Sequence, residues 1–83
     1  MLVTSVNIMK IDDENTRKKG IASVVFDNCF VVNDIKIISG NNGLFVAMPS
    51  RKKVDGTNKD IVHPINVETR QMIEEAILSE YNK

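Results

Sequence analysis

The chain has 83 residues, and its eleven basic and eleven acidic side chains cancel. This length corresponds to one domain, residues 1–83, whose stability is marginal unless a disulfide, a metal ion or a second subunit supports it. One cysteine excludes an internal disulfide, and one cysteine with one histidine is too few for a zinc site. Self-association is therefore the remaining support, while the zero net charge excludes a polybasic, histone-like protein.

The composition also bears on location. No apolar run approaches the roughly 20 residues that a membrane-spanning helix requires. The first residues, Met1–Ser5, lack the basic and apolar regions of a secretory signal. The free thiol of Cys29 suits a reducing compartment. We therefore expect a cytoplasmic globular domain that does not contact a membrane.

The first two-thirds of the chain predict antiparallel strands, because β-branched and aliphatic runs alternate with turn residues. The polar run Asp12–Lys19 predicts a loop, and Asp27-Asn28 predicts a tight turn. In Gly40–Gly43, Asn42 and Gly43 predict a hairpin turn because both tolerate positive φ. The expected strands are Leu2–Ile11, Ile21–Phe26, Phe30–Ser39 and Leu44–Met48.

The last third begins with a polar, basic loop, Ser50–Lys59, followed by a short returning strand over Lys59–His63. Apolar residues then recur at helical spacing and predict an amphipathic helix over Val67–Tyr81, with Asn66 as its N-cap. The residues on the apolar side are Met72, Ile73, Ala76, Ile77 and Tyr81. The expected fold is α+β, with a small antiparallel sheet of four to five strands and one C-terminal helix.

The strands carry apolar residues on both faces, as Ile21–Phe26 shows most clearly. A helix of 15 residues is only about 22 Å long and covers one sheet face at most. We therefore expect the second face, or a sheet edge, to contact another copy of the chain in a homodimer.

Candidates for catalysis are few. A nucleophilic cysteine requires a base beside it, and nothing in the sequence places His63 near Cys29. The segment Gly40–Gly43 lacks the Lys-Ser/Thr ending of a phosphate-binding loop. We expect no catalytic residue, no metal, no cofactor and no small-molecule substrate, and hence a protein that is not an enzyme.

The basic loop is the strongest candidate for a binding site. Arg51, Lys52, Lys53 and Lys59 fall within nine residues that contain one acid, Asp55. Such a loop can neutralise phosphates and release counterions, or it can be a solvated connector, and residue types alone favour the connector. The aromatic side chains of the strands are expected in the core, which leaves no platform for stacking bases. These are Phe26, Phe30 and Phe45.

From Phe30 onward the chain resembles the stage V sporulation protein G (SpoVG) family of small bacterial regulators. The resemblance is carried by Gly40–Ser50 (GNNGLFVAMPS), by Asp55-Gly56, by Lys59–Asn66 (KDIVHPIN) and by Thr69-Arg70. It extends over essentially the whole chain.

The resemblance implies a dimeric α+β regulator of sporulation, septation or related gene expression that binds DNA, with RNA as a second candidate. Arg51–Lys53 match the basic loop of the family, and Arg70 matches an arginine at the start of its helix. This match reverses the preference for a connector. The residues expected to contact phosphates are Arg51, Lys52, Lys53, Lys59 and Arg70.

Departures from the family pattern, among them the charge of Lys53 where a neutral residue is common, leave the preferred nucleic-acid sequence open. Asn58 stands where an aromatic residue is common, and Asn33 replaces a common histidine. A competing hypothesis is a protein-interaction module that acts on septation without binding nucleic acid. Its contact surface would be the acidic helix face, with Glu68 and Glu75, or the polar hairpin Asn41-Asn42.

Overall fold

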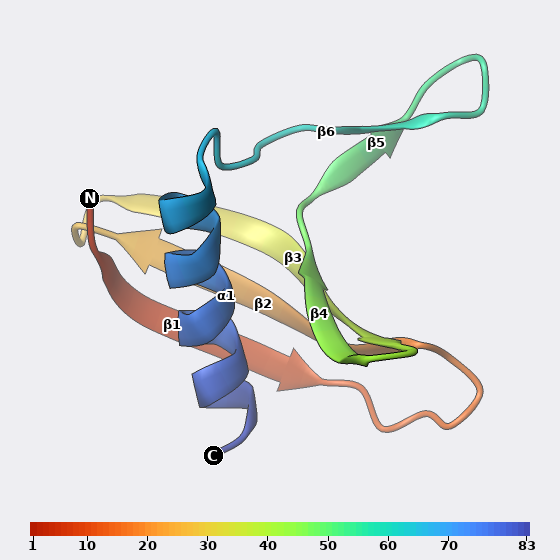
Figure 1. Ribbon diagram of the computed structural model, residues 1–83, viewed down its shortest axis with the longest axis horizontal. Coiled ribbons are helices and arrows are strands. Elements are labelled where there is room, and N and C mark those ends of the chain that lie inside the picture. The colour runs from red at the N-terminus through yellow and green to blue at the C-terminus, as the bar shows by residue number, and fades with distance from the viewer.

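The computed structural model describes all 83 residues and contains six strands and one helix (Figure 1). Strands β1 to β4 form one antiparallel sheet in chain order, and β5 pairs with β6 in a separate hairpin. The α+β prediction is therefore confirmed. The elements are β1 Val3–Lys10, β2 Lys18–Phe26, β3 Phe30–Gly40, β4 Gly43–Ala47, β5 Ser50–Lys52, β6 Asn58–Asp60 and α1 Val67–Tyr81.

The turns between strands follow the local chemistry in most places. Asp27 and Asn28 both have positive φ, 52° and 55°, as a primed hairpin turn requires. In the β3–β4 hairpin, Gly40 pairs with Gly43, so Asn41 and Asn42 are the two loop residues. Of these four residues only Gly43 has positive φ, 115°, and the turn predicted at Asn42-Gly43 was displaced by one residue.

Strand β2 begins three residues earlier than predicted. Lys18 and Lys19 belong to the strand although their charges suggested a loop, because they continue the pairing with the ends of β1 and β3. The Ile11 amide donates to the Lys19 carbonyl at 3.0 Å, and Lys18 is aligned with Ile38. Pairing of the backbone prevails here over the low strand propensity of lysine.

The helix prediction is confirmed at both ends. The side chain of Asn66 accepts a hydrogen bond from the Thr69 amide at 2.8 Å, which satisfies one of the free N–H groups of the first turn. Glu68 lies in that turn, where the helix dipole favours an anion. The helix is too short and too polar to cross a lipid bilayer.

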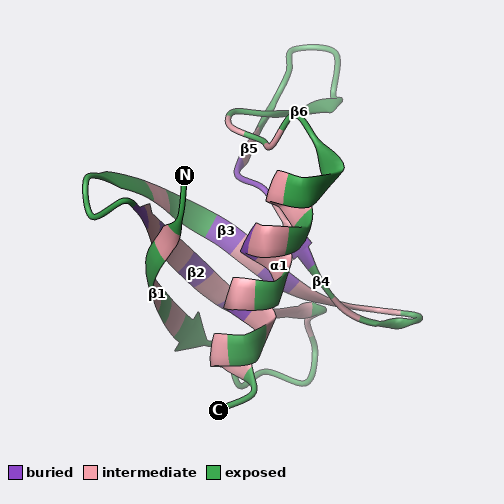
Figure 2. Ribbon diagram, turned by 60° about the vertical axis from the view of Figure 1, so that its left-hand side comes forward, coloured by how far each residue is buried: buried purple, intermediate pink, exposed green.

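The core lies between α1 and one face of the sheet (Figure 2). Ile73 and Ile77 are the buried residues of the helix, and they pack against alternate residues of β2, β3 and β4. The nine core residues are Ala22, Val24, Phe26, Ile35, Ile37, Val46, Met48, Ile73 and Ile77.

Two aromatic residues predicted for the core are exposed instead. Phe30 is 60% exposed because it is the first residue of β3, at the end of the sheet. Phe45 is 45% exposed because strand residues alternate between faces and its neighbour Val46 points into the core. Only Phe26 is buried.

The face of the sheet opposite α1 has no covering element. One row across it is Met9, Ile21, Lys36 and Ala47, each aligned with the next. Polar and apolar side chains are mixed on this surface, which we call the open face. The open face comprises Ser5, Asn7, Met9, Ile21, Ser23, Val25, Val31, Asn33, Asp34, Lys36, Ile38, Phe45 and Ala47.

Candidate functional site

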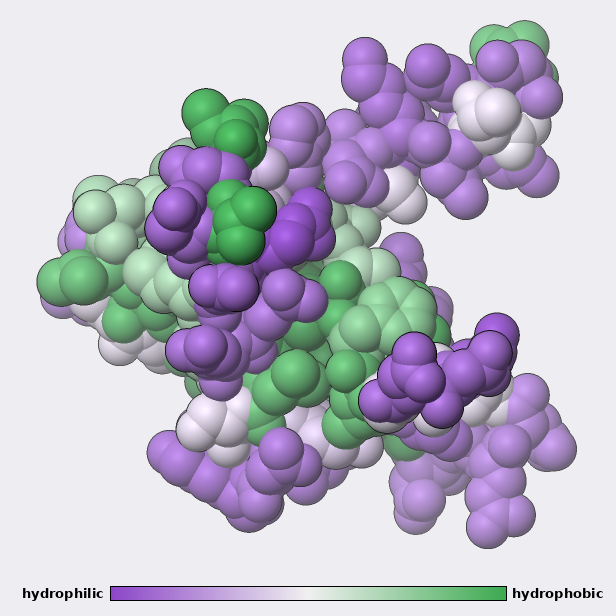
Figure 3. All heavy atoms as spheres, viewed as in Figure 1, coloured by the Kyte–Doolittle hydropathy of each residue, from purple (hydrophilic) through white to green (hydrophobic).

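The hairpin Ser50–Asp60 projects from the body of the molecule, and we call it the basic arm (Figure 1). It is coloured almost wholly as hydrophilic in the space-filling view (Figure 3). The loop predicted here is therefore a β-hairpin. Its turn is closed by two backbone hydrogen bonds, from the Lys53 amide to the Thr57 carbonyl at 2.6 Å and from the Gly56 amide to the Lys53 carbonyl at 3.0 Å. Gly56 supplies the positive φ, 91°, that this turn needs.

The single acid near the tip of the arm is engaged in the turn. The Asp55 carboxylate accepts hydrogen bonds from the Thr57 hydroxyl at 2.7 Å and from the Thr57 amide at 3.0 Å. These hydrogen bonds hold the pKa of Asp55 below its ordinary value of 3.8. The carboxylate organises the turn and forms no ion pair with the neighbouring lysines.

This arrangement predicts a pH dependence of the turn. A lowered pKa in the folded state means that Asp55 stabilises the turn above pH 3.8, and that this contribution disappears as the pH falls through the lower, folded-state pKa. In an NMR titration the Thr57 amide should shift with a midpoint below 3.8. Thr57→Val should move that midpoint up towards 3.8, since it removes the hydroxyl donor. An unchanged midpoint would contradict the hydrogen bond.

The cations of the arm have no internal counter-ion. Arg51 is aligned with Lys59 on the neighbouring strand, and like charges directly opposite each other destabilise a β pair. The one salt bridge of the molecule joins Lys83 to Glu80, 3.1 Å apart at the C-terminus. A like-charge pair on an exposed hairpin is relieved by a bound anion.

The structure brings four of the five predicted site residues together. They line one shallow hollow with Asp60 and Ile61, and they are Arg51, Lys52, Lys53 and Lys59. Arg70 is separate, since it lies in the first turn of α1, half-buried, and its amide donates to the Asn66 carbonyl. Whether Arg70 contacts nucleic acid stays a prediction.

A second basic triplet, Arg17–Lys19, has a different environment. The Arg17 guanidinium lies 3.4 Å from the side-chain oxygen of Asn41, and the Lys19 ammonium lies 3.5 Å from the carbonyl of Asp13. These contacts link the β1–β2 loop to the β3–β4 hairpin and to itself. The triplet therefore has local partners that the basic arm lacks.

The two residues considered for catalysis have ordinary surroundings. Cys29 is exposed in the β2–β3 turn. The Nδ1 atom of His63 lies 3.0 Å from the carbonyl oxygen of its neighbour Pro64, and His63 forms no hydrogen bond with Cys29. No cluster of three metal-ligating side chains is present.

A feature that the sequence did not reveal is an apolar pocket of about 210 Å³ at the end of the sheet near the start of α1. Met1, Phe30 and Pro64 line this pocket. Leu2 and Ile65, which follow Met1 and Pro64 in the chain, are exposed. Together with Val67 these residues form a surface that we call the apolar end. Ile65 is 89% exposed and Val67 is 66% exposed, so these aliphatic side chains are uncovered. Its only sequence signal was two aliphatic residues outside the apolar stripe of the helix.

Comparisons with known proteins identify the family of this chain. The SpoVG family model matches residues 1–83. A "Putative septation protein SpoVG" of Caldicellulosiruptor bescii is 62% identical over 81 residues, which is 98% of this chain and 91% of the relative. Proteins of the same name from Phytoplasma australiense and Clostridium perfringens are each 60% identical, and they cover 98% and 100% of the chain. The chain covers 83% and 91% of these two relatives.

Proposed function

Because the chain belongs to the SpoVG family and its basic arm has no internal counter-ion, we propose that it is a non-enzymatic bacterial regulator that binds DNA through this arm. RNA is the second candidate ligand. The regulated process is septation or sporulation-related gene expression. The observation that carries the proposal is the like-charge pair of Arg51 and Lys59, which costs stability in the free protein and favours a polyanion.

The electrostatics of the rest of the chain support an oriented complex. The chain is neutral in total, so a phosphate backbone is attracted by the arm and not by the molecule as a whole. The helix carries Glu68, Glu74, Glu75 and Glu80, which repel phosphates from its side of the sheet. Cations that neutralise phosphates release condensed counterions and thereby supply affinity that depends on salt.

A dimer is part of the proposal. The apolar end suits a second copy better than the open face does, because Asn7, Ser23 and Lys36 interrupt the open face with polar groups. The apolar end instead exposes several large apolar side chains around an apolar pocket. Two-fold symmetry would present two basic arms to one duplex.

The experiment that tests this function neutralises the arm. The triple variant Arg51→Gln, Lys52→Gln, Lys53→Gln removes three positive charges while it keeps polar, unbranched side chains. Duplex affinity measured by fluorescence anisotropy should fall at least tenfold at low salt, and the slope of log K against log[salt] should become less steep by about three for each arm that contacts the duplex.

The matched control is the triple variant Arg17→Gln, Lys18→Gln, Lys19→Gln, which removes the same charge from a triplet in which Arg17 and Lys19 have local partners. It should retain most of the affinity and the slope. Equal losses in the two variants would show that only net charge matters, and unchanged binding in the arm variant would refute the proposed site.

A second function is favoured by the outer face of α1. Glu68, Gln71 and Glu75 lie along a shallow surface hollow there, which suits contact with a basic protein surface. In that case the chain acts on septation by binding a protein partner. Capture of a defined partner that survives neutralisation of the arm but is lost with Glu68→Gln, Glu75→Gln would support this alternative.

A further inference from the structure

Phe45 is an exposed aromatic ring on a sheet surface. Its ring lies against Gly40, where an added Cβ atom would come within 2.9 Å of the ring. The glycine therefore makes room for the ring to lie across the neighbouring strand. A planar ring in this position can accept a nucleobase by stacking, as aromatic residues on other sheet surfaces do.

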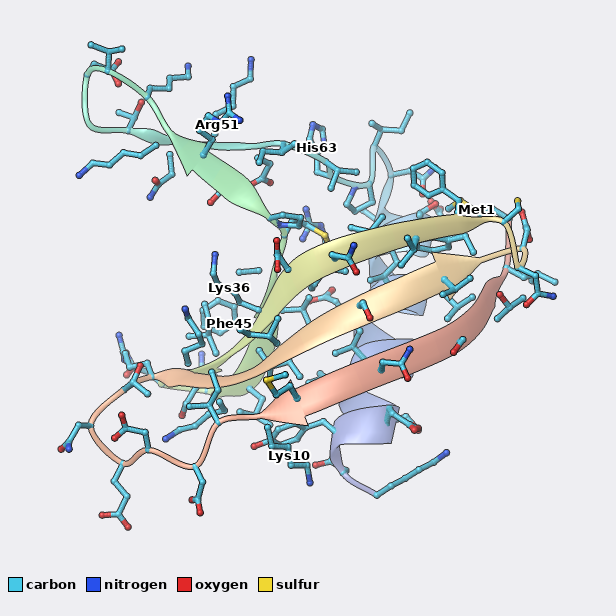
Figure 4. All side chains as sticks on the ribbon, turned by 180° about the vertical axis from the view of Figure 1, so that it is seen from behind. Met1, Lys10, Lys36, Phe45, Arg51 and His63 are labelled. Carbon is cyan, nitrogen blue, oxygen red and sulfur yellow. The ribbon has the colours of Figure 1, made fainter.

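Lys36 lies on the other side of Phe45 from Gly40, because Phe45 is aligned with Ile38. Lys36 is aligned with Ala47 on β4, so Phe45, two residues earlier, is its diagonal neighbour across the strands, at a Cα separation of about 7–8 Å. Figure 4 views the open face, with Lys36 and Phe45 near each other and Arg51 beyond them on the arm. Lys36 forms no salt bridge. Phe45 therefore offers a contact for a base, and Lys36 offers a separate contact for a phosphate.

The open face is continuous with the basic arm. Three shallow hollows follow one another across the surface. The first, which includes Asn7, shares Ile21 and Asp34 with the second, which includes Lys36. The second shares Ile61 with the hollow of the arm cations. These shared residues define a track that runs from the arm past Lys36 to Asn7, and Phe45 lies beside it as the diagonal neighbour of Lys36.

The polar groups of the track suit base edges better than backbone phosphates. Asn7, Ser23 and Asn33 offer amide and hydroxyl groups that donate and accept hydrogen bonds. The exposed carboxylate of Asp34 would repel a phosphate but accepts from the amino group of a base. Stacking on Phe45 needs an unpaired base, so the ring and these polar groups together suit a single strand better than an intact duplex.

From this continuity and chemistry we propose that the open face binds a single-stranded segment of DNA or RNA that runs on from the basic arm. One base stacks on Phe45, a phosphate lies at Lys36, and the polar track contacts the edges of neighbouring bases. This inference rests on the proposed nucleic-acid function and adds a second element to it.

The first test compares single strands with a duplex. Phe45→Leu keeps an apolar side chain of similar volume but removes the ring. Its affinity for labelled oligo(dT) or oligo(U) should fall about 5- to 150-fold, the effect of losing one stacked base. Duplex affinity, which depends on the arm, should change less than twofold. Lys36→Gln should weaken single-strand binding and reduce its salt slope by about one.

The second test reports stacking directly. The chain has no tryptophan, so Phe45→Trp introduces a single fluorophore at the proposed contact. Oligo(dT) should quench it with the same midpoint as the anisotropy titration. Tyr81→Trp is the matched control, because Tyr81 lies on the helix, behind the sheet. The Lys10 ammonium lies over the Tyr81 ring, 4.9 Å from its centre. Its fluorescence should not change.

The outcomes separate this proposal from the function on which it rests. Equal losses for duplex and single strand in Phe45→Leu, or no quenching at position 45, would overturn the track and leave the arm intact. Absence of all binding by the unaltered chain would refute both. A change in sedimentation of Phe45→Leu would overturn the track in favour of a subunit contact. A preference between oligo(dT) and oligo(U) identifies DNA or RNA as the ligand.

Discussion

Replacing Ile77 by alanine is expected to destabilise the folded chain by about 3–4 kcal/mol. Ile77 is the helix residue that is fully buried between α1 and the sheet, where Ile37 is also fully buried. Removal of a large aliphatic side chain from such a site costs about 2–5 kcal/mol because it loses apolar burial and leaves a cavity. Urea unfolding followed by circular dichroism, at one fixed protein concentration, measures the change.

The control is Val54→Ala at the tip of the basic arm, where the side chain is fully exposed. It should change the unfolding free energy by less than about 0.5 kcal/mol. A loss below 1 kcal/mol for Ile77→Ala would contradict the packing of the helix on the sheet.

Replacing Ile65 by aspartate is expected to weaken the proposed dimer at least 100-fold. Ile65 is the most exposed side chain of the apolar end. A carboxylate buried in an apolar contact without a partner costs several kcal/mol, and each 1.4 kcal/mol is a factor of ten in the dissociation constant. Sedimentation velocity over a concentration series measures this change, and the folded monomer should keep its far-ultraviolet spectrum.

Met9→Asp is the matched variant on the open face, where Met9 is 72% exposed. It should leave the dimer intact. If Met9→Asp dissociated the dimer and Ile65→Asp did not, the subunit contact would lie on the open face. A wild-type chain that sediments as a monomer at tens of micromolar would contradict the dimer altogether.

Local patterns were sufficient for most of the fold. The helix was predictable from the Asn66 cap and the apolar spacing that ends at Tyr81, and both bounds agree with the structure. The Asp27-Asn28 turn was predictable because both residues tolerate positive φ. Features determined by neighbouring strands were harder to predict from the sequence. Lys18 and Lys19 are an example, because their strand conformation depends on pairing with β1 and β3.

The candidate site was predictable in residue type but not in shape. The four cations of the arm were identifiable from their spacing, whereas the hairpin depends on the Asp55–Thr57 turn within a polar sequence. The exposure of Phe45 could not be read from an apolar strand, because periodicity does not say which face the helix covers. The apolar pocket requires Met1, Phe30 and Pro64 to meet in three dimensions, and no local pattern brings them together.

The measurement that tests the central claim most directly is duplex binding by the unaltered chain across a salt series. Each neutralised phosphate contributes about −0.9 to the slope of log K against log[salt]. The four cations of one basic arm therefore predict a slope of about −4, and the arms of a dimer engaged together predict about −7. An affinity that does not change with salt concentration, or no binding at low salt, would contradict the proposal that the chain binds nucleic acid through this arm.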